Sequence, residues 1–102
     1  MAFEKVADVG SIPSGQGLIV ESGGRQIAVF NCEGTLYATQ NNCAHRGGPL
    51  ADGLIEGTVV TCPWHGWEYD VTSGECHTNP KARIATFPVK VEGDDVLVDA
   101  GA

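Results

Sequence analysis

The stretches CAHRGGPLADG (residues 43–53) and CPWHGWEYDVTSGE (residues 62–75) decide the fold of this chain. In each stretch a cysteine stands two or three positions before a histidine, and the pairs are Cys43 with His45 and Cys62 with His65. Glycine and proline surround both pairs, which is typical of loops. Cysteine and histidine are metal-binding residues, and 16 residues separate His45 from Cys62, so the sequence predicts two loops that share a metal.

Three interpretations of these mixed pairs are open from the residues alone. Ordinary core cysteines and surface histidines are a poor explanation for two such pairs on two glycine-rich loops. A tetrahedral zinc site is the second, but zinc fingers usually pair cysteine with cysteine and histidine with histidine. The third is a [2Fe–2S] cluster with two cysteines on one iron and two histidines on the other, so that each loop binds both irons.

The two motifs resemble those of the Rieske ferredoxins, and weaker similarity covers almost the whole chain. The resemblance implies one Rieske [2Fe–2S] cluster, whose ligands would be Cys43, His45, Cys62 and His65. It also implies an all-β Rieske fold of three small antiparallel sheets in a single domain, residues 1–102. A cluster-binding subdomain of about residues 40–77 would be inserted in a β basal part made from residues 1–39 and 78–102.

This sequence differs at several motif positions from one branch of the family, and these differences indicate which branch it resembles. The Rieske proteins of respiratory complexes carry two further cysteines that form a disulfide, and Gly48 and Trp64 stand at those positions here. A serine that donates to a cluster sulfide is replaced by Trp67, whereas Tyr69 matches a tyrosine that donates to a cysteine sulfur. The pattern resembles the single-domain ferredoxins associated with oxygenases.

The function that this resemblance implies is one-electron transport. The chain would pass electrons from a flavin reductase to a terminal ring-hydroxylating oxygenase in aromatic hydrocarbon catabolism, as a monomer. His45 and His65 would each bind iron through one nitrogen and leave the other at the surface as the electron port. An enzyme is not expected, because His77 is the only histidine left and cannot complete a mononuclear iron site. The alternatives are the small subunit of a nitrite-reductase-like complex and, more remotely, a zinc-bound structural module.

Hydrophobic periodicity supports the all-β prediction. Residues Thr86 to Glu92 alternate, with Phe87, Val89 and Val91 on one side of a predicted strand. Asn41 to Gly57 breaks this rhythm and is expected to be a long functional loop. The other predicted strands are Phe3–Val9, Gly17–Glu21, Gln26–Asn31, Leu36–Thr39, Thr58–Thr61, Trp67–Tyr69 and Val96–Val98, mostly separated by glycine-containing turns.

The composition of the chain limits which partners it is expected to bind and in which cellular compartment it is expected to act. With 102 residues, 42% hydrophobic and 19% charged, the chain is expected to be one globular domain. Its net charge of −7 argues against nucleic acid and suits docking to a basic protein surface. No apolar run is long enough to span a membrane, and the first residues do not resemble a secretory signal. We therefore expect a cytoplasmic protein whose four cysteines are thiols or metal ligands.

The remaining notable residues are given ordinary roles where the motif does not need them. Cys32 and Cys76 are expected to fill the core, and His77 to lie on the surface. Docking to a partner is predicted for Arg46 and Trp64, a core position for Trp67, and a third loop over the cluster for Pro80.

Overall fold

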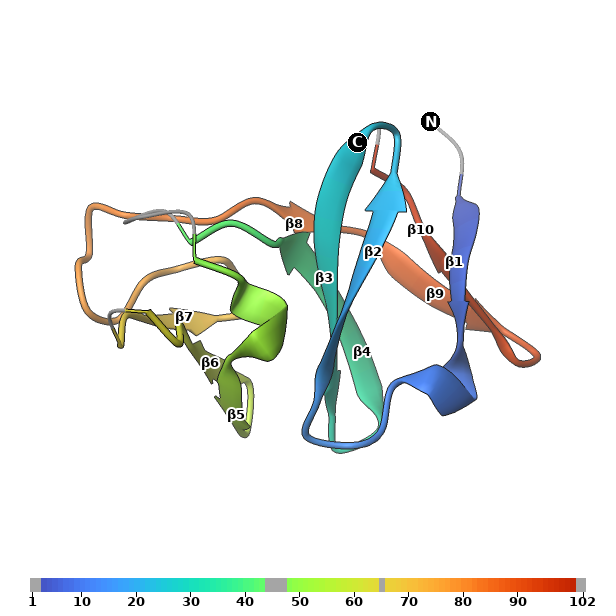
Figure 1. Cartoon of the computed structure of the whole chain (residues 1–102), viewed down its shortest axis with the longest axis horizontal. Helices are drawn as coiled ribbons and strands as arrows, with labels where there is room; N and C mark the ends of the chain where they lie inside the picture. The colour runs from blue at the N-terminus through green and yellow to red at the C-terminus, as the bar shows by residue number, and fades with distance from the viewer. Residues whose placement is uncertain (1–2, 44–47, 65, 101–102) are drawn as a thin grey trace.

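The described residues of the chain form three antiparallel sheets, which confirms the predicted fold class (Figure 1). The computed structural model describes residues 3–43, 48–64 and 66–100. The strand orders are β1-β10-β9, β2-β3-β4-β8 and β5-β6-β7. The strands are β1 (Glu4–Asp8), β2 (Gly17–Ser22), β3 (Arg25–Cys32), β4 (Thr35–Gln40), β5 (Leu54–Glu56), β6 (Val59–Thr61), β7 (Glu68–Asp70), β8 (Thr86–Phe87), β9 (Val89–Glu92) and β10 (Asp95–Val98).

Strand β3 separates two hydrophobic cores. Successive side chains of a strand point to opposite faces, and residues 27–30 of β3 are all fully buried. Ala28 and Phe30 face the core that contains Cys43 and Cys62, whereas Ile27 and Val29 face a second core with β8 and β10. Burial on both faces explains why this strand reads as a nearly continuous apolar run.

The hairpin turns form where the sequence places glycine. Glu33 and Gly34 join β3 to β4 with φ values of 55° and 95°. Gly23 and Gly24 join β2 to β3 with φ values of 60° and 77°. Two consecutive positive φ values match the twist of the flanking strands, so these turns set the register of the central sheet.

The single strand predicted for Thr86 to Glu92 is wrong. The chain divides there into β8, which pairs with β4, and β9, which pairs with β10. Pro88 stands at the division because proline has no N–H for a sheet, and its carbonyl accepts a bond from Asp99 N–H at 3.1 Å. The predicted common face is lost as well, since Phe87 is buried while Val91 is 48% exposed.

The stretch from Asn41 to Gly57 is more regular than the loop we expected. It contains the 3-10 helix η2 (Leu50–Asp52) and strand β5, in which Ile55 pairs with Val60 of β6. A second 3-10 helix, η1 (Val9–Ser11), follows β1. Neither short helix in the described part of the chain has the length and hydropathy needed to cross a membrane.

Candidate metal centre

Cys43 and Cys62 each lie at the start of a loop that is closed by backbone hydrogen bonds. Cys43 N–H donates to the Gly48 carbonyl at 2.9 Å, just inside a bridge between Asn42 and Pro49. Cys62 follows β6, and its N–H donates to the Trp67 carbonyl at 2.7 Å. The cysteines are 3% and 1% exposed, so two buried sulfur atoms are held on two hairpin ends.

The two loops meet at Gly48. A Cβ atom on Gly48 would lie 2.8 Å from Cys62 Sγ and 3.0 Å from Cγ of Trp64. Because real Cβ contacts are essentially never under 3.0 Å, any side chain at position 48 would displace its neighbours. Glycine therefore allows the backbone of the first loop to approach the sulfur of the second.

Tyr69 contacts the sulfur of the first loop through its hydroxyl group. Its hydroxyl lies 3.1 Å from Cys43 Sγ, and the whole residue is buried on β7 opposite Val60. When Cys43 is a thiolate, the hydroxyl is the donor of this hydrogen bond. The predicted contact between Tyr69 and a motif cysteine is confirmed.

The two motif histidines, His45 and His65, lie outside the described residues, as does Arg46. Within the residues that are described, no three His, Cys, Asp or Glu side chains form a metal site. The structure thus places the two predicted sulfur ligands, Cys43 and Cys62, in the same buried core. Two buried thiols on glycine-lined loops, with a hydroxyl beside one of them, fit an iron–sulfur cluster, whose ligands are thiolates tuned by hydrogen bonds.

Cys32 and Cys76 occupy structural positions, as predicted. Cys32 ends β3, and burial raises the pKa of its thiol, with smaller contributions from the negative charges of Asp70 and Glu33. Cys76 is 4% exposed, and its Sγ accepts a hydrogen bond from Asn79 N–H at 3.4 Å. Cys76 thereby holds the turn that contains Pro80, which is exposed. The placement of Pro80 over a cluster stays a prediction.

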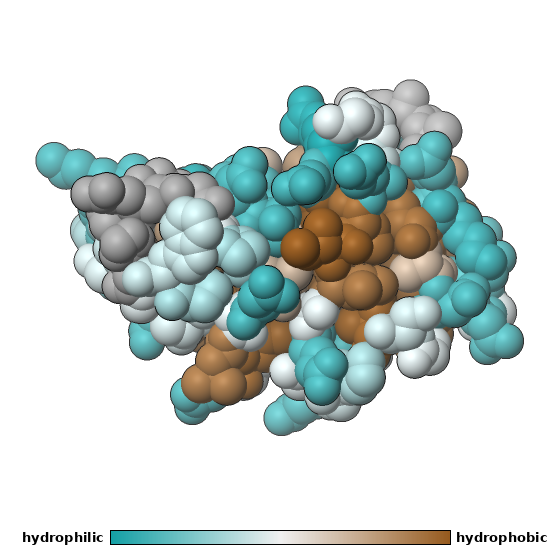
Figure 2. All heavy atoms as spheres, viewed as in Figure 1, coloured by the Kyte–Doolittle hydropathy of each residue, from teal (hydrophilic) through white to brown (hydrophobic). Residues whose placement is uncertain are grey.

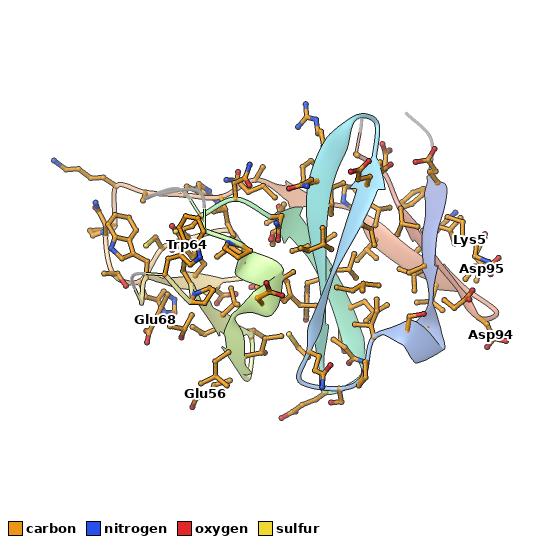
Figure 3. All side chains as sticks on the ribbon, in the orientation of Figure 1. Lys5, Glu56, Trp64, Glu68, Asp94 and Asp95 are labelled. Atoms are coloured by element: carbon orange, nitrogen blue, oxygen red, sulfur yellow. The ribbon has the colours of Figure 1, made fainter. Side chains whose placement is uncertain are left out.

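The remaining predicted residues divide between surface and core. His77 is exposed, and it lines a shallow cleft with Glu56 and Glu68. Trp67 is partly buried and packs against the core around Cys43 and Cys62, as expected. Trp64 is 58% exposed, and it lies at the end of the molecule that the β5-β6-β7 sheet forms (Figure 3). The contact of Gly48 with Trp64 and Cys62 was not predicted, because no local pattern reveals which residues of two loops meet.

The chain is similar to known iron–sulfur proteins in both sequence and structure. Residues 2–88 match the model of the Rieske [2Fe-2S] domain. The ferredoxin component of the naphthalene 1,2-dioxygenase system of Pseudomonas aeruginosa is 39% identical over 89 residues, which are 86% of each chain. The ferredoxin of Sphingomonas yanoikuyae B1 is similar in structure, with a TM-score of 0.87, 31% identity and coverage of 96% of this chain and 98% of that one.

Two further structures bear on the choice of branch. A ferredoxin solved in complex with the oxygenase of carbazole 1,9a-dioxygenase has a TM-score of 0.85 and 28% identity over 94% of this chain and 91% of that one. A nitrite reductase small subunit from Mycobacterium tuberculosis has a TM-score of 0.88 over 95% and 93% of the two chains, but its 20% identity shows only the shared fold. The family match supports the iron–sulfur interpretation of the mixed pairs over zinc, and the chain belongs to the Rieske [2Fe–2S] family, among its ferredoxins.

Proposed function

We propose that this protein carries single electrons from a flavin-containing reductase to a terminal ring-hydroxylating oxygenase. The observation that carries the proposal is the pair of buried sulfurs on two closed loops, in a chain 39% identical to a naphthalene dioxygenase ferredoxin component. The relatives are named as ferredoxin components of dioxygenase systems, which are carriers rather than catalysts.

Four residues are proposed as ligands of the cluster. Cys43 and Cys62 would bind one iron as thiolates, and His45 and His65 would bind the other through neutral imidazoles. When bound, the cluster accepts and releases one electron. The chain keeps the two thiolates out of water, and the Tyr69 hydroxyl stabilises negative charge at Cys43 Sγ.

The partners are proposed from the systems to which the relatives belong. One relative is named as part of a naphthalene dioxygenase system, and another was solved in complex with an oxygenase. We propose an equivalent oxygenase and a flavoprotein reductase for this chain, which would act as a monomer in the cytoplasm.

The proposed domain organisation places a cluster-binding subdomain at about residues 40–77, between basal segments 1–39 and 78–102. The β5-β6-β7 sheet falls inside the first range and lies at one end of the molecule (Figure 1). Its core is shared with Ala28, Phe30 and Ile84 from outside that range. We therefore regard the subdomain as a structural division that depends on the base for its packing.

Reconstitution tests the function directly. The purified protein should contain two irons and two acid-labile sulfides per chain, bleach with dithionite and give a rhombic EPR signal. A naphthalene-type flavoprotein reductase with NADH should reduce it, and the reduced protein should then support dihydroxylation by the matching oxygenase. One zinc without sulfide would exclude the cluster. A protein that contains the cluster but transfers electrons only to a nitrite reductase large subunit would favour the alternative function, the small subunit of a nitrite-reductase-like complex.

A further inference from the structure

Trp64 is placed where it touches both loops of the metal centre. The point at which a Gly48 Cβ would stand is 3.0 Å from Cγ and 3.1 Å from Cδ2 of Trp64. The same point is 2.8 Å from Cys62 Sγ. The indole ring of the second loop and the sulfur of Cys62 thus lie together against the bare Cα of the first loop.

Cys62 and Trp64 differ strongly in burial. Cys62 is 1% exposed, although it directly follows β6, in the sheet at one end of the molecule (Figure 1). Trp64 is 58% exposed, so part of the ring faces solvent while another part contacts Gly48. A large flat side chain in this position excludes water from the space beside the sulfur and joins the loops through dispersion contacts.

Local hydrogen bonds explain how each loop is closed on itself. The Cys43 N–H donates a hydrogen bond to the Gly48 carbonyl within the first loop, and the Cys62 N–H donates one to the Trp67 carbonyl within the second. The contact between Gly48 and Trp64 instead runs from one loop to the other. It therefore acts on the separation of the loops and on the exposure of Cys62 Sγ.

We propose that Trp64 is a positioning residue, whose indole clamps the first loop against the second and shields Cys62 Sγ from water. This inference rests on the proposed cluster site. A shielded thiolate retains iron longer, and the reduction potential of an iron–sulfur centre depends on solvent exposure and on hydrogen bonds to sulfur. Removing the ring should therefore speed loss of the cluster and raise its potential.

The experiment compares Trp64→Ala and Trp64→Phe with Leu54→Ala. Leu54 is the matched control, because it is an apolar residue of the β5-β6-β7 sheet and is 66% exposed on β5. Each holoprotein is mixed with excess iron chelator, and the decay of visible absorbance is followed without any partner protein. The midpoint potential is measured by redox titration.

We expect Trp64→Ala to lose its cluster about tenfold faster than the native protein, with a higher midpoint potential. Trp64→Phe should restore most of the native rate and potential, since it keeps an aromatic ring against Gly48. Leu54→Ala should match the native protein in both measurements. If Trp64→Ala does not assemble a cluster, Trp64→Leu, which keeps apolar bulk without the ring, is measured in its place.

Native rates of cluster loss and a native potential in Trp64→Ala would overturn the proposal. Equal acceleration by Leu54→Ala would overturn it too, because the effect would then not depend on the loop contact. A native protein that holds no iron and sulfide would instead overturn the cluster site, and this inference with it.

Discussion

The hydrogen bond between Tyr69 and Cys43 Sγ should raise the reduction potential, because it stabilises the charge that the added electron brings. Tyr69→Phe removes a hydrogen bond to a thiolate sulfur, and a bond that is about 1 kcal/mol stronger in the reduced state than in the oxidised state corresponds to roughly 40 mV for one electron. We expect the midpoint potential to fall by that amount in a redox titration. Tyr37→Phe is the control, since Tyr37 packs beside the same core. An unchanged potential in Tyr69→Phe would show that the hydroxyl does not act on the cluster.

The native potential should lie below zero at neutral pH, in the lower part of the range of roughly −150 to +300 mV for Rieske centres. Tyr69 is one retained donor, whereas Trp67 replaces the serine hydroxyl found in the respiratory branch. Gly48 and Trp64 replace its two disulfide cysteines. A clearly positive value, measured by the same titration, would place the protein functionally with the respiratory branch.

The four cysteines should separate into two classes by mutation. Replacing Cys43, His45, Cys62 or His65 by alanine should abolish or badly damage cluster assembly, measured as iron and sulfide per chain. Cys32→Ala and Cys76→Ala should keep the cluster and lower the free energy of unfolding by about 1 kcal/mol, because each leaves a small cavity. Loss of colour in either of the last two variants would contradict the proposed ligand set.

Neighbouring residues of β3 should differ in their effect on the metal centre. Phe30 faces the core that contains Cys43 and Cys62, and Ile27 faces the other core. Phe30→Ala should cost about 3–5 kcal/mol and Ile27→Ala about 2–5 kcal/mol, since both side chains are fully buried. At temperatures where both variants remain folded by circular dichroism, we expect only Phe30→Ala to release iron faster. Equal release would mean that the two cores do not act separately.

Several elements could be predicted from local sequence, and others could not. The turns at Glu33–Gly34 and Gly23–Gly24 have a direct signal, because consecutive positive φ values favour glycine. Strand β5 has none, since three residues with only Ile55 turned inward make no recognisable alternation. The division at Pro88 has no local signal either, because the alternation of apolar and polar residues continues across it. Which sheet each half joins is decided by pairing with β4 and β10, far away in the sequence.

The same limit applies to the metal centre. The spacing of Cys43 and Cys62 from their histidines identifies the loops, and Tyr69 was predicted from family resemblance. The packing of Trp64 on Gly48 follows only when the loops are folded, because residues 16 positions apart carry no periodic signal.

The whole molecule carries a net charge of −7, which should steer it toward basic partner surfaces. Hydrophilic side chains cover much of the face in Figure 2, while apolar ones gather over β2 and at β5. Electron transfer from the reductase should therefore slow as ionic strength rises from low to physiological values, measured by stopped-flow absorbance. Electron-transfer rates that do not change with ionic strength would favour an apolar docking surface, of which Trp64 is the first candidate residue.

The position of the charge should matter as well as its sum. Glu68 is exposed at the end of the molecule formed by the β5-β6-β7 sheet, and Asp94 is exposed at the opposite end (Figure 3). Glu68→Gln and Asp94→Asn change the net charge equally. If the partner docks at the end of the molecule that carries the proposed cluster, Glu68→Gln should reduce the salt dependence of electron transfer more than Asp94→Asn does. An equal effect of both variants would mean that steering depends on net charge alone.

The backbone bonds that close the loops at Cys43 and Cys62 have a further consequence for a carrier. Each transfer changes the charge of the centre by one unit, and the surroundings must adjust to it. Groups that are already oriented around the sulfurs need little movement to do so. A low reorganisation energy follows, so the speed of each exchange should be governed by how the two proteins meet rather than by rearrangement within this one.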